Sequence, residues 1–164
     1  MKTNKSTRHA KIAGDFGEAL VLYWLSKYGF ECASVDHTGI DLIARNPYTG
    51  EVMGISVKGR TRTHGAEADY VRIPSEDFDK VHAACTAFNC SPYFAVVVDA
   101  GSLIRVFIAS LTHLLGLHPR TNSGSGWRMS EHHLAKYAAD PEVMMFQLTT
   151  ETNRWWTAIP GGAK

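Results

Sequence analysis

Hydrophobic and polar residues alternate on both sides of one short turn signal. Residues 40–44 read Ile-Asp-Leu-Ile-Ala, and residues 54–58 read Gly-Ile-Ser-Val-Lys. Between them, residues 46–50 read Asn-Pro-Tyr-Thr-Gly, with Pro where a turn presets φ and Gly where it needs a permissive backbone. Alternation with a period of two is typical of a strand that has one buried face. The pattern therefore predicts a β-hairpin.

The register of this hairpin decides which polar side chains meet. If Asn46 pairs with Glu51 across the turn, Asp41 lies opposite Ser56. Because side chains alternate along a strand, Ser56 then shares its face with Lys58, and Asp41 shares its face with Ile43. The other face is apolar and is formed by Ile40, Leu42, Ala44, Ile55 and Val57.

A carboxylate and an ammonium on such a hairpin are costly to desolvate unless they are paired or bind a ligand. Asp41 and Lys58 are therefore candidate site residues. The simpler alternative is that they form a cross-strand ion pair, which is worth only about 0.2–1 kcal/mol.

Residues 12–28 have the period of an amphipathic helix. The apolar stripe expected to face the core is Phe16, Leu20, Tyr23 and Trp24. Glu18 lies on a ridge with Leu22 and Leu25, at the i+4 and i+7 positions, which favours a side chain that points toward the sheet. A solvated Glu18 is the alternative.

Two glycines near Glu18 strengthen this interpretation. Gly14 and Gly17 each cost about 1 kcal/mol in helix propensity relative to Ala, so they indicate a close approach of backbone or ligand.

The remainder of the chain predicts further elements. We expect a helix over 75–89 with the stripe Phe78, Val81, Cys85 and Phe88, a buried strand over 93–99, a neighbouring strand over 103–109, a short helix over 111–117, a flexible loop over 121–127, a helix over 130–139 and an edge strand over 144–148.

Composition is that of an ordinary globular protein. The 164 residues are 45% hydrophobic and 20% charged, with a net charge of +1, which suits one domain over 1–164. No apolar run is long enough to span a membrane and the first residues are polar and basic, so we expect a cytoplasmic protein. The three cysteines, Cys32, Cys85 and Cys90, lack zinc spacing and are expected to be buried thiols.

Basic residues gather in two places, although the net charge is small. One cluster precedes the Glu18 helix and includes Lys11, and the other extends from Lys58 through Arg60 and Arg62. Lys11, Arg60 and Arg62 are therefore candidate contacts to a phosphate backbone. A solvated basic tail is the alternative for the N-terminal cluster.

The order of these elements and motifs resembles a known superfamily. Residues 14–18 (Gly-Asp-Phe-Gly-Glu), Asp41 and residues 57–60 (Val-Lys-Gly-Arg) are similar to the motifs of PD-(D/E)XK nucleases, most of all to Holliday-junction resolvase-like and restriction-endonuclease-like members. The resemblance covers about residues 10 to 100. No Gly-rich phosphate loop or Cys-His or Ser-His pair at a recognisable spacing points to another enzyme class.

The resemblance implies a fold, an activity and a site. The expected fold is α/β (α+β), a mixed central sheet flanked by helices, with an αβββαβ core over about 10–109 and extra elements over about 110–164. The expected activity is metal-dependent DNA endonuclease, on duplex or branched DNA. Glu18 and Asp41 would hold Mg²⁺ or Mn²⁺, and Lys58 would act on the attacking water or the phosphate.

Assembly follows from the same expectation. Cutting both strands needs two centres, so we expect a symmetric homodimer, with Trp155 and Trp156 as part of its contact.

One position departs from the superfamily pattern. Ser56 stands two residues before Lys58, where an acid or Gln is usual, and a hydroxyl does not hold a divalent ion as a carboxylate does. Some restriction enzymes of the superfamily supply the missing carboxylate from the following helix. Candidates here are Glu67, Asp69, Glu76 and Asp79, of which Glu76 is taken with Ser56 as a supporting residue. The alternative is a catalytically degenerate module that binds nucleic acid or a partner.

Overall fold

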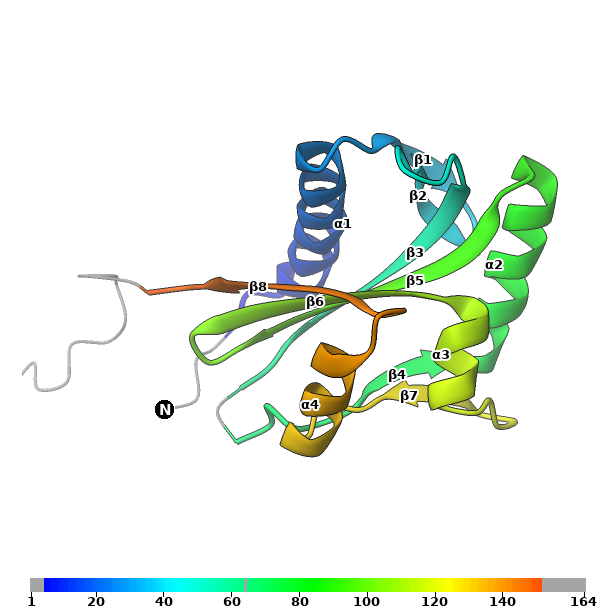
Figure 1. Cartoon of the computed structure of the whole chain (residues 1–164). Helices are drawn as coiled ribbons and strands as arrows, with labels where there is room; N and C mark the ends of the chain where they lie inside the picture. The colour runs from blue at the N-terminus through cyan, green and yellow to red at the C-terminus, as the bar shows by residue number, and fades with distance from the viewer. Residues whose placement is uncertain (1–4, 64, 152–164) are drawn as a thin grey trace, which may run out of the picture.

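The computed structural model describes residues 5–63 and 65–151 of the chain (Figure 1). The elements in order are α1 (His9–Lys27), β1 (Glu31–His37), β2 (Ile40–Arg45), β3 (Val52–Thr61), β4 (Val71–Pro74), α2 (Ser75–Phe88), β5 (Ser91–Ala100), β6 (Leu103–Ser110), α3 (Leu111–Leu117), β7 (Gly124–Trp127), α4 (Glu131–Ala139) and β8 (Met144–Thr149). No helix in these two described ranges is long and apolar enough to cross a membrane.

Six strands form the central sheet, in the order β1-β2-β3-β5-β6-β8. Strands β3 and β5 are parallel and are joined through α2, while the other neighbours are antiparallel. Strands β4 and β7 form a separate two-stranded ribbon. The predicted mixed sheet with flanking helices is confirmed, and β4 is an addition to the expected αβββαβ order.

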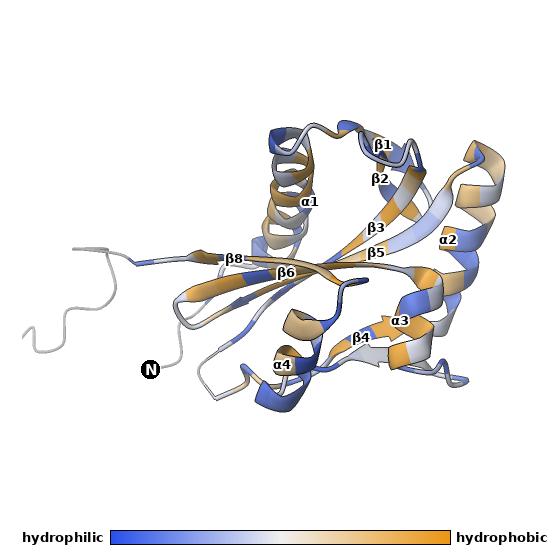
Figure 2. Cartoon of the chain, in the orientation of Figure 1, coloured by the Kyte–Doolittle hydropathy of each residue, from blue (hydrophilic) through white to orange (hydrophobic). Residues whose placement is uncertain are grey.

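The sheet is covered on both faces (Figure 1). Helix α1 packs on one face, where Leu20, Val21 and Leu25 meet the apolar residues of β2, β3, β5 and β6. Helices α2, α3 and α4 and the β4–β7 ribbon form the other core cluster, which includes Trp127 and Tyr137. Figure 2 shows hydrophobic residues along most of β6, as expected for a strand buried between two layers.

The predicted hairpin forms in the predicted register. The Asn46 amide donates to the Glu51 carbonyl oxygen at 2.8 Å, and Leu42 is paired with Ile55. The placement of Ile40 was wrong, because it packs in the α2-side cluster whereas Leu42 and Ala44 pack against α1. The β1–β2 pairing is irregular between Ser34 and His37 at this end of β2, which accounts for the break in alternation.

The predicted apolar stripe of α1 was also partly wrong. Phe16 is 46% exposed and Tyr23 is 59% exposed. The buried face is instead Gly17, Leu20, Val21 and Leu25. A Cβ on Gly17 would lie 3.6 Å from the side chains of Val57 and Val97, so this glycine lets the helix approach the sheet, as its cost in helix propensity suggested.

The region expected to be a flexible loop over 121–127 contains strand β7, which pairs with β4. Trp127 is 1% exposed and belongs to the core. The sequence Gly-Ser-Gly-Trp lacks hydrophobic alternation, so only the pairing with β4 makes it a strand.

Helix α1 begins three residues before its expected start at residue 12, and the other predicted elements are present within two residues of their expected bounds. In α2 the stripe is buried except for Phe88, which is 45% exposed. Cys85 is buried, while Cys32 and Cys90 are only partly buried. Trp155 and Trp156 lie outside the described residues.

Candidate active site

Asp41 sits at the start of β2, beside the middle of β3. Its Oδ2 accepts a hydrogen bond from the Val57 amide at 2.6 Å and a longer one from the Ser56 hydroxyl at 3.5 Å. Ser56 is only 3% exposed, so its hydroxyl is buried against this carboxylate. Both contacts use Oδ2, which leaves Oδ1 available to a ligand.

Glu18 is half-buried on α1 and interacts electrostatically with Asp41. Burial raises the pKa of Glu18, and the negative charges of Asp41 and Asp15 raise it further, whereas Lys11 and Lys58 lower it. Because the charge of Asp41 acts on Glu18, the two carboxylates lie on the same part of the surface. The expectation that Glu18 points toward the sheet agrees with this arrangement.

The close approach of α1 to β3 brings Glu18 near Asp41. A Cβ on Gly59 would lie 3.1 Å from the Ala13 carbonyl oxygen, and Gly17 faces Val57 and Val97. Glycines on both elements therefore let the helix backbone approach β3, the strand that carries Lys58. Glu18 follows Gly17 directly, so its backbone lies next to this close contact with the sheet.

Lys58 has a partner that sequence analysis did not single out. Its Nζ lies 3.0 Å from Asp77 Oδ2, and the two side chains are 20% and 18% exposed. Asp77 is in the first turn of α2, where the helix dipole favours an acid. No ion pair joins Lys58 to Asp41 within residues 5–63 and 65–151, so the cross-strand alternative was wrong.

A helical pattern could have pointed to Asp77. Asp77 precedes the buried Val81 by four residues and so shares its ridge, which turns the carboxylate toward the sheet. Glu76, by contrast, is 69% exposed and pairs with Lys80 at 3.2 Å.

The other acids proposed to replace the missing carboxylate lie elsewhere. Asp79 is 69% exposed and forms a two-point contact with Arg120, which lowers the pKa of Asp79. Asp69 is exposed, and its backbone carbonyl accepts from Arg62 at 3.4 Å. Glu67 is partly buried in the same loop. Asp77 is thus the acid of α2 that contacts Lys58.

The donor set at Glu18 and Asp41 fits a divalent cation. Carboxylate and hydroxyl oxygens are hard ligands of the kind that Mg²⁺ prefers, and an ion there would relieve the repulsion that raises the pKa of Glu18. These oxygen ligands are nevertheless few for a metal site. Within the described part of the chain, three metal-binding side chains come within 4.8 Å only at His113, Asp140 and Glu142, which already pair with one another.

The predicted nucleic-acid contacts have different surroundings. Lys11 pairs with Asp15 at 3.0 Å, and both side chains are mostly exposed. Arg60 is exposed and donates to the Gly59 carbonyl at 2.7 Å. Arg62 donates to the Tyr70 carbonyl at 2.9 Å, so it holds the loop before β4. Lys11 and Arg60 are therefore the more accessible of the three.

Comparison with known proteins identifies the fold. No family model and no curated protein matches this sequence. Among solved structures, the chain is similar to Hjc, a Holliday junction resolvase of Archaeoglobus fulgidus, with a TM-score of 0.51 and 16% identity over 72% of this chain and 91% of that one. A restriction endonuclease in complex with substrate DNA matches with a TM-score of 0.42 and 15% identity, over 93% of this chain and 77% of that one. The likeness to Hjc shows that this chain shares the fold of that resolvase, with a central mixed sheet flanked by helices.

Proposed function

We propose that this protein is a Mg²⁺- or Mn²⁺-dependent DNA endonuclease of the PD-(D/E)XK type. The observation that carries the proposal is the pair of mutually repelling carboxylates, Glu18 and Asp41, beside the ammonium of Lys58. The likeness of the fold to that of Hjc, a Holliday junction resolvase, supports it.

Each residue has a role in this proposal. Glu18 and Asp41 would hold the ion, which supplies Lewis-acid polarisation of a phosphodiester and a nucleophile at neutral pH. Val57 and Ser56 orient the Asp41 carboxylate through their hydrogen bonds. Lys58 donates to the attacking water or to the phosphate as negative charge develops.

Asp77 is a positioning residue in this scheme. Its carboxylate fixes the Lys58 ammonium at 3.0 Å and partly shields it from solvent. A lysine suits this place because its pKa responds to desolvation more readily than that of arginine. Asp77 is also the acid that α2 brings to Lys58, in line with the superfamily members that take a carboxylate from the following helix.

A degenerate DNA-binding module is the second candidate, and two observations favour it. Ser56 supplies a hydroxyl where an acid is usual, and Lys58 is already paired with Asp77. In that case the fold and the exposed Arg60 and Lys11 would serve binding alone.

Asp41→Asn separates the two candidates. We expect it to lower cleavage of supercoiled, linear and branched DNA at least 100-fold, since removing a metal ligand or an electrostatic contact to the transition state costs on the order of 10²–10³ in rate. DNA affinity should be unchanged or higher, because one negative charge leaves the phosphate path. Glu31→Gln is the matched control, since it neutralises an exposed acid at the opposite end of the hairpin.

The assay compares wild type and both variants across Mg²⁺ and Mn²⁺ concentrations, with binding measured in parallel. If wild-type protein binds DNA but cuts none of these substrates with either metal, the degenerate module is the correct assignment.

A homodimer is part of the same proposal. Cutting two strands needs two centres, and this chain offers one constellation of Glu18, Asp41 and Lys58. Light scattering of the protein with and without duplex DNA tests it, and a monomer under both conditions would contradict it.

A further inference from the structure

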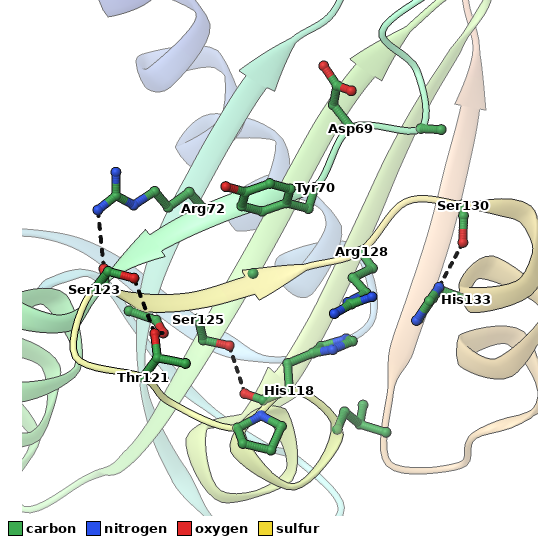
Figure 3. A pocket seen from close by; sticks show the side chains of 15 residues that line it. Asp69, Tyr70, Arg72, His118, Thr121, Ser123, Ser125, Arg128, Ser130 and His133 are labelled. Atoms are coloured by element: carbon green, nitrogen blue, oxygen red, sulfur yellow. Dashed lines mark hydrogen bonds between the residues drawn. The ribbon is translucent and has the colours of Figure 1, made fainter.

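A second polar pocket lies outside the candidate active site, on the outer side of the β4–β7 ribbon (Figure 3). Its volume is about 710 Å³, large enough for a nucleotide. The ribbon forms one wall, and the ends of α3 and α4 contribute His118 and His133. None of Glu18, Asp41 and Lys58 lines it.

An aromatic platform forms part of this wall. A Cβ on Gly126 would lie 2.6 Å from the Tyr70 ring, so this ring rests directly on the backbone of Gly126. Tyr70 is nevertheless 58% exposed. One side of the ring is therefore supported by the ribbon, while much of the residue remains accessible from the pocket.

Positive charge flanks this platform. Arg72 is paired with Gly126 across the ribbon, and Tyr70 and Arg128 directly flank its last pair, Val71 and Trp127. Because side chains alternate, Tyr70, Arg72 and Arg128 all project from the outer side. Asp69 is the single acid among the residues that line the pocket.

The imidazoles of the pocket add no positive charge to that of the two arginines at neutral pH. Burial, with smaller contributions from His133 and Arg128, lowers the pKa of His118 to about 4. Burial and Arg128 also lower the pKa of His133. At neutral pH the pocket thus presents two guanidinium groups, neutral imidazoles and the hydroxyls of Thr121, Ser123, Ser125 and Ser130.

A side-chain hydrogen bond links strand β3, which carries Lys58, to strand β4 of the pocket. Arg60, two residues after Lys58 on β3, donates to the Arg72 carbonyl at 3.5 Å. Strand β4 then leads directly into α2, whose first turn carries Asp77, the partner of Lys58. A DNA strand that leaves the site along β3 therefore meets the ribbon next.

We propose that this pocket binds one unpaired nucleotide of a DNA substrate, with the base stacked on Tyr70 and the phosphate held by Arg72 and Arg128. Resting on the proposed nuclease function, this assigns the substrate class as duplex DNA that adjoins a single-stranded segment. The base must be unpaired because bases within a duplex are covered on both faces by their neighbours. Stacking on an aromatic ring beside cationic side chains is the common mode by which proteins hold single strands.

The experiment measures binding without metal, so it does not depend on cleavage. Fluorescence anisotropy is recorded for the full-length protein with one labelled duplex, blunt or carrying a single-stranded overhang. Tyr70→Ala should weaken the overhang complex on the order of tenfold and leave the blunt duplex unchanged, because the lost interaction is base stacking. Tyr70→Phe should bind like wild type, because it keeps the ring.

Arg128→Gln tests the phosphate contact. It should weaken the overhang complex and reduce the slope of log affinity against log salt by about 0.7, as expected for one single-strand phosphate. Tyr48→Ala and Arg45→Gln are matched controls, since both residues are exposed near the β2–β3 turn. Thermal unfolding confirms that all variants fold.

The possible outcomes separate the alternatives. The proposal is overturned if Tyr70→Ala changes binding no more than Tyr48→Ala, or if blunt and overhang DNA weaken equally. A mononucleotide that displaces the overhang DNA at equal nucleotide concentration would instead assign the pocket to a free nucleotide. Loss of cleavage in Asp41→Asn tests the active site independently, so either proposal can fail while the other stands.

Discussion

The ion pair between Lys58 and Asp77 makes a quantitative prediction for Asp77→Asn. At 3.0 Å, the gross Coulomb attraction is about 5.5 kcal/mol at an effective dielectric constant of ~20. Desolvation of both side chains offsets much of this, since each is about one-fifth exposed. The net loss from leaving the Lys58 ammonium without its charged partner is about 1.5–3 kcal/mol, the range for a hydrogen bond between charged groups.

Such a loss is large enough to measure. For a chain of this size, 1 kcal/mol corresponds to about 2–4 °C in Tm, so Asp77→Asn should lower Tm by roughly 3–12 °C. Urea denaturation at constant m-value checks the same quantity. Glu76→Gln is the control, because Glu76 is 69% exposed and its i,i+4 pair with Lys80 is worth only about 0.3–0.5 kcal/mol.

The same variant tests the positioning role of Asp77. If Lys58 acts in the proposed reaction, Asp77→Asn should lower kcat about tenfold or more with little change in KM, because the ammonium loses its orientation. Asp77→Glu should restore part of this activity, since it keeps the charge. Equal stability and equal cleavage for Asp77→Asn and Glu76→Gln would refute the reasoning, because the two acids would then be equivalent despite their different surroundings.

Two further predictions concern single titratable side chains. Glu18→Gln should raise the free energy of unfolding at pH 7 in EDTA, because burial and Asp41 raise the pKa of Glu18 and so disfavour the ionised form in the folded state. Mg²⁺ should raise the Tm of the wild type but not that of this variant, and calorimetry with and without the metal checks both statements. The pKa of His118 is lowered from 6.5 to about 4, so its contribution to stability is complete above pH 6.5 and falls by up to about 3 kcal/mol as the pH falls toward 4. His118→Gln keeps a donor for the Tyr137 hydroxyl and should flatten the pH dependence of urea denaturation between pH 6.5 and 4.

Local patterns of the sequence were enough to predict the hairpin, its register and the two helices beside it. The turn at 46–50 determines which residues of β2 and β3 are paired, and this places Ser56 against Asp41. Of the two glycines that indicated a close approach, Gly17 makes one to Val57 and Val97, whereas a Cβ on Gly14 would meet nothing within 4 Å. These features follow from periodicity and turn chemistry, which act over a few residues.

Tertiary packing alone decided which side chains complete the site. The ridge that Asp77 shares with Val81 distinguishes it from Glu76 and Asp79, but only the docking of this helix on β3 brings its carboxylate to Lys58. Likewise, residues 124–127 become a strand only because β4 pairs with them, and this pairing creates the Tyr70 platform on Gly126. Such contacts join segments 19 to more than 50 residues apart, and their geometry depends on how whole elements pack against one another, which local periodicity does not encode.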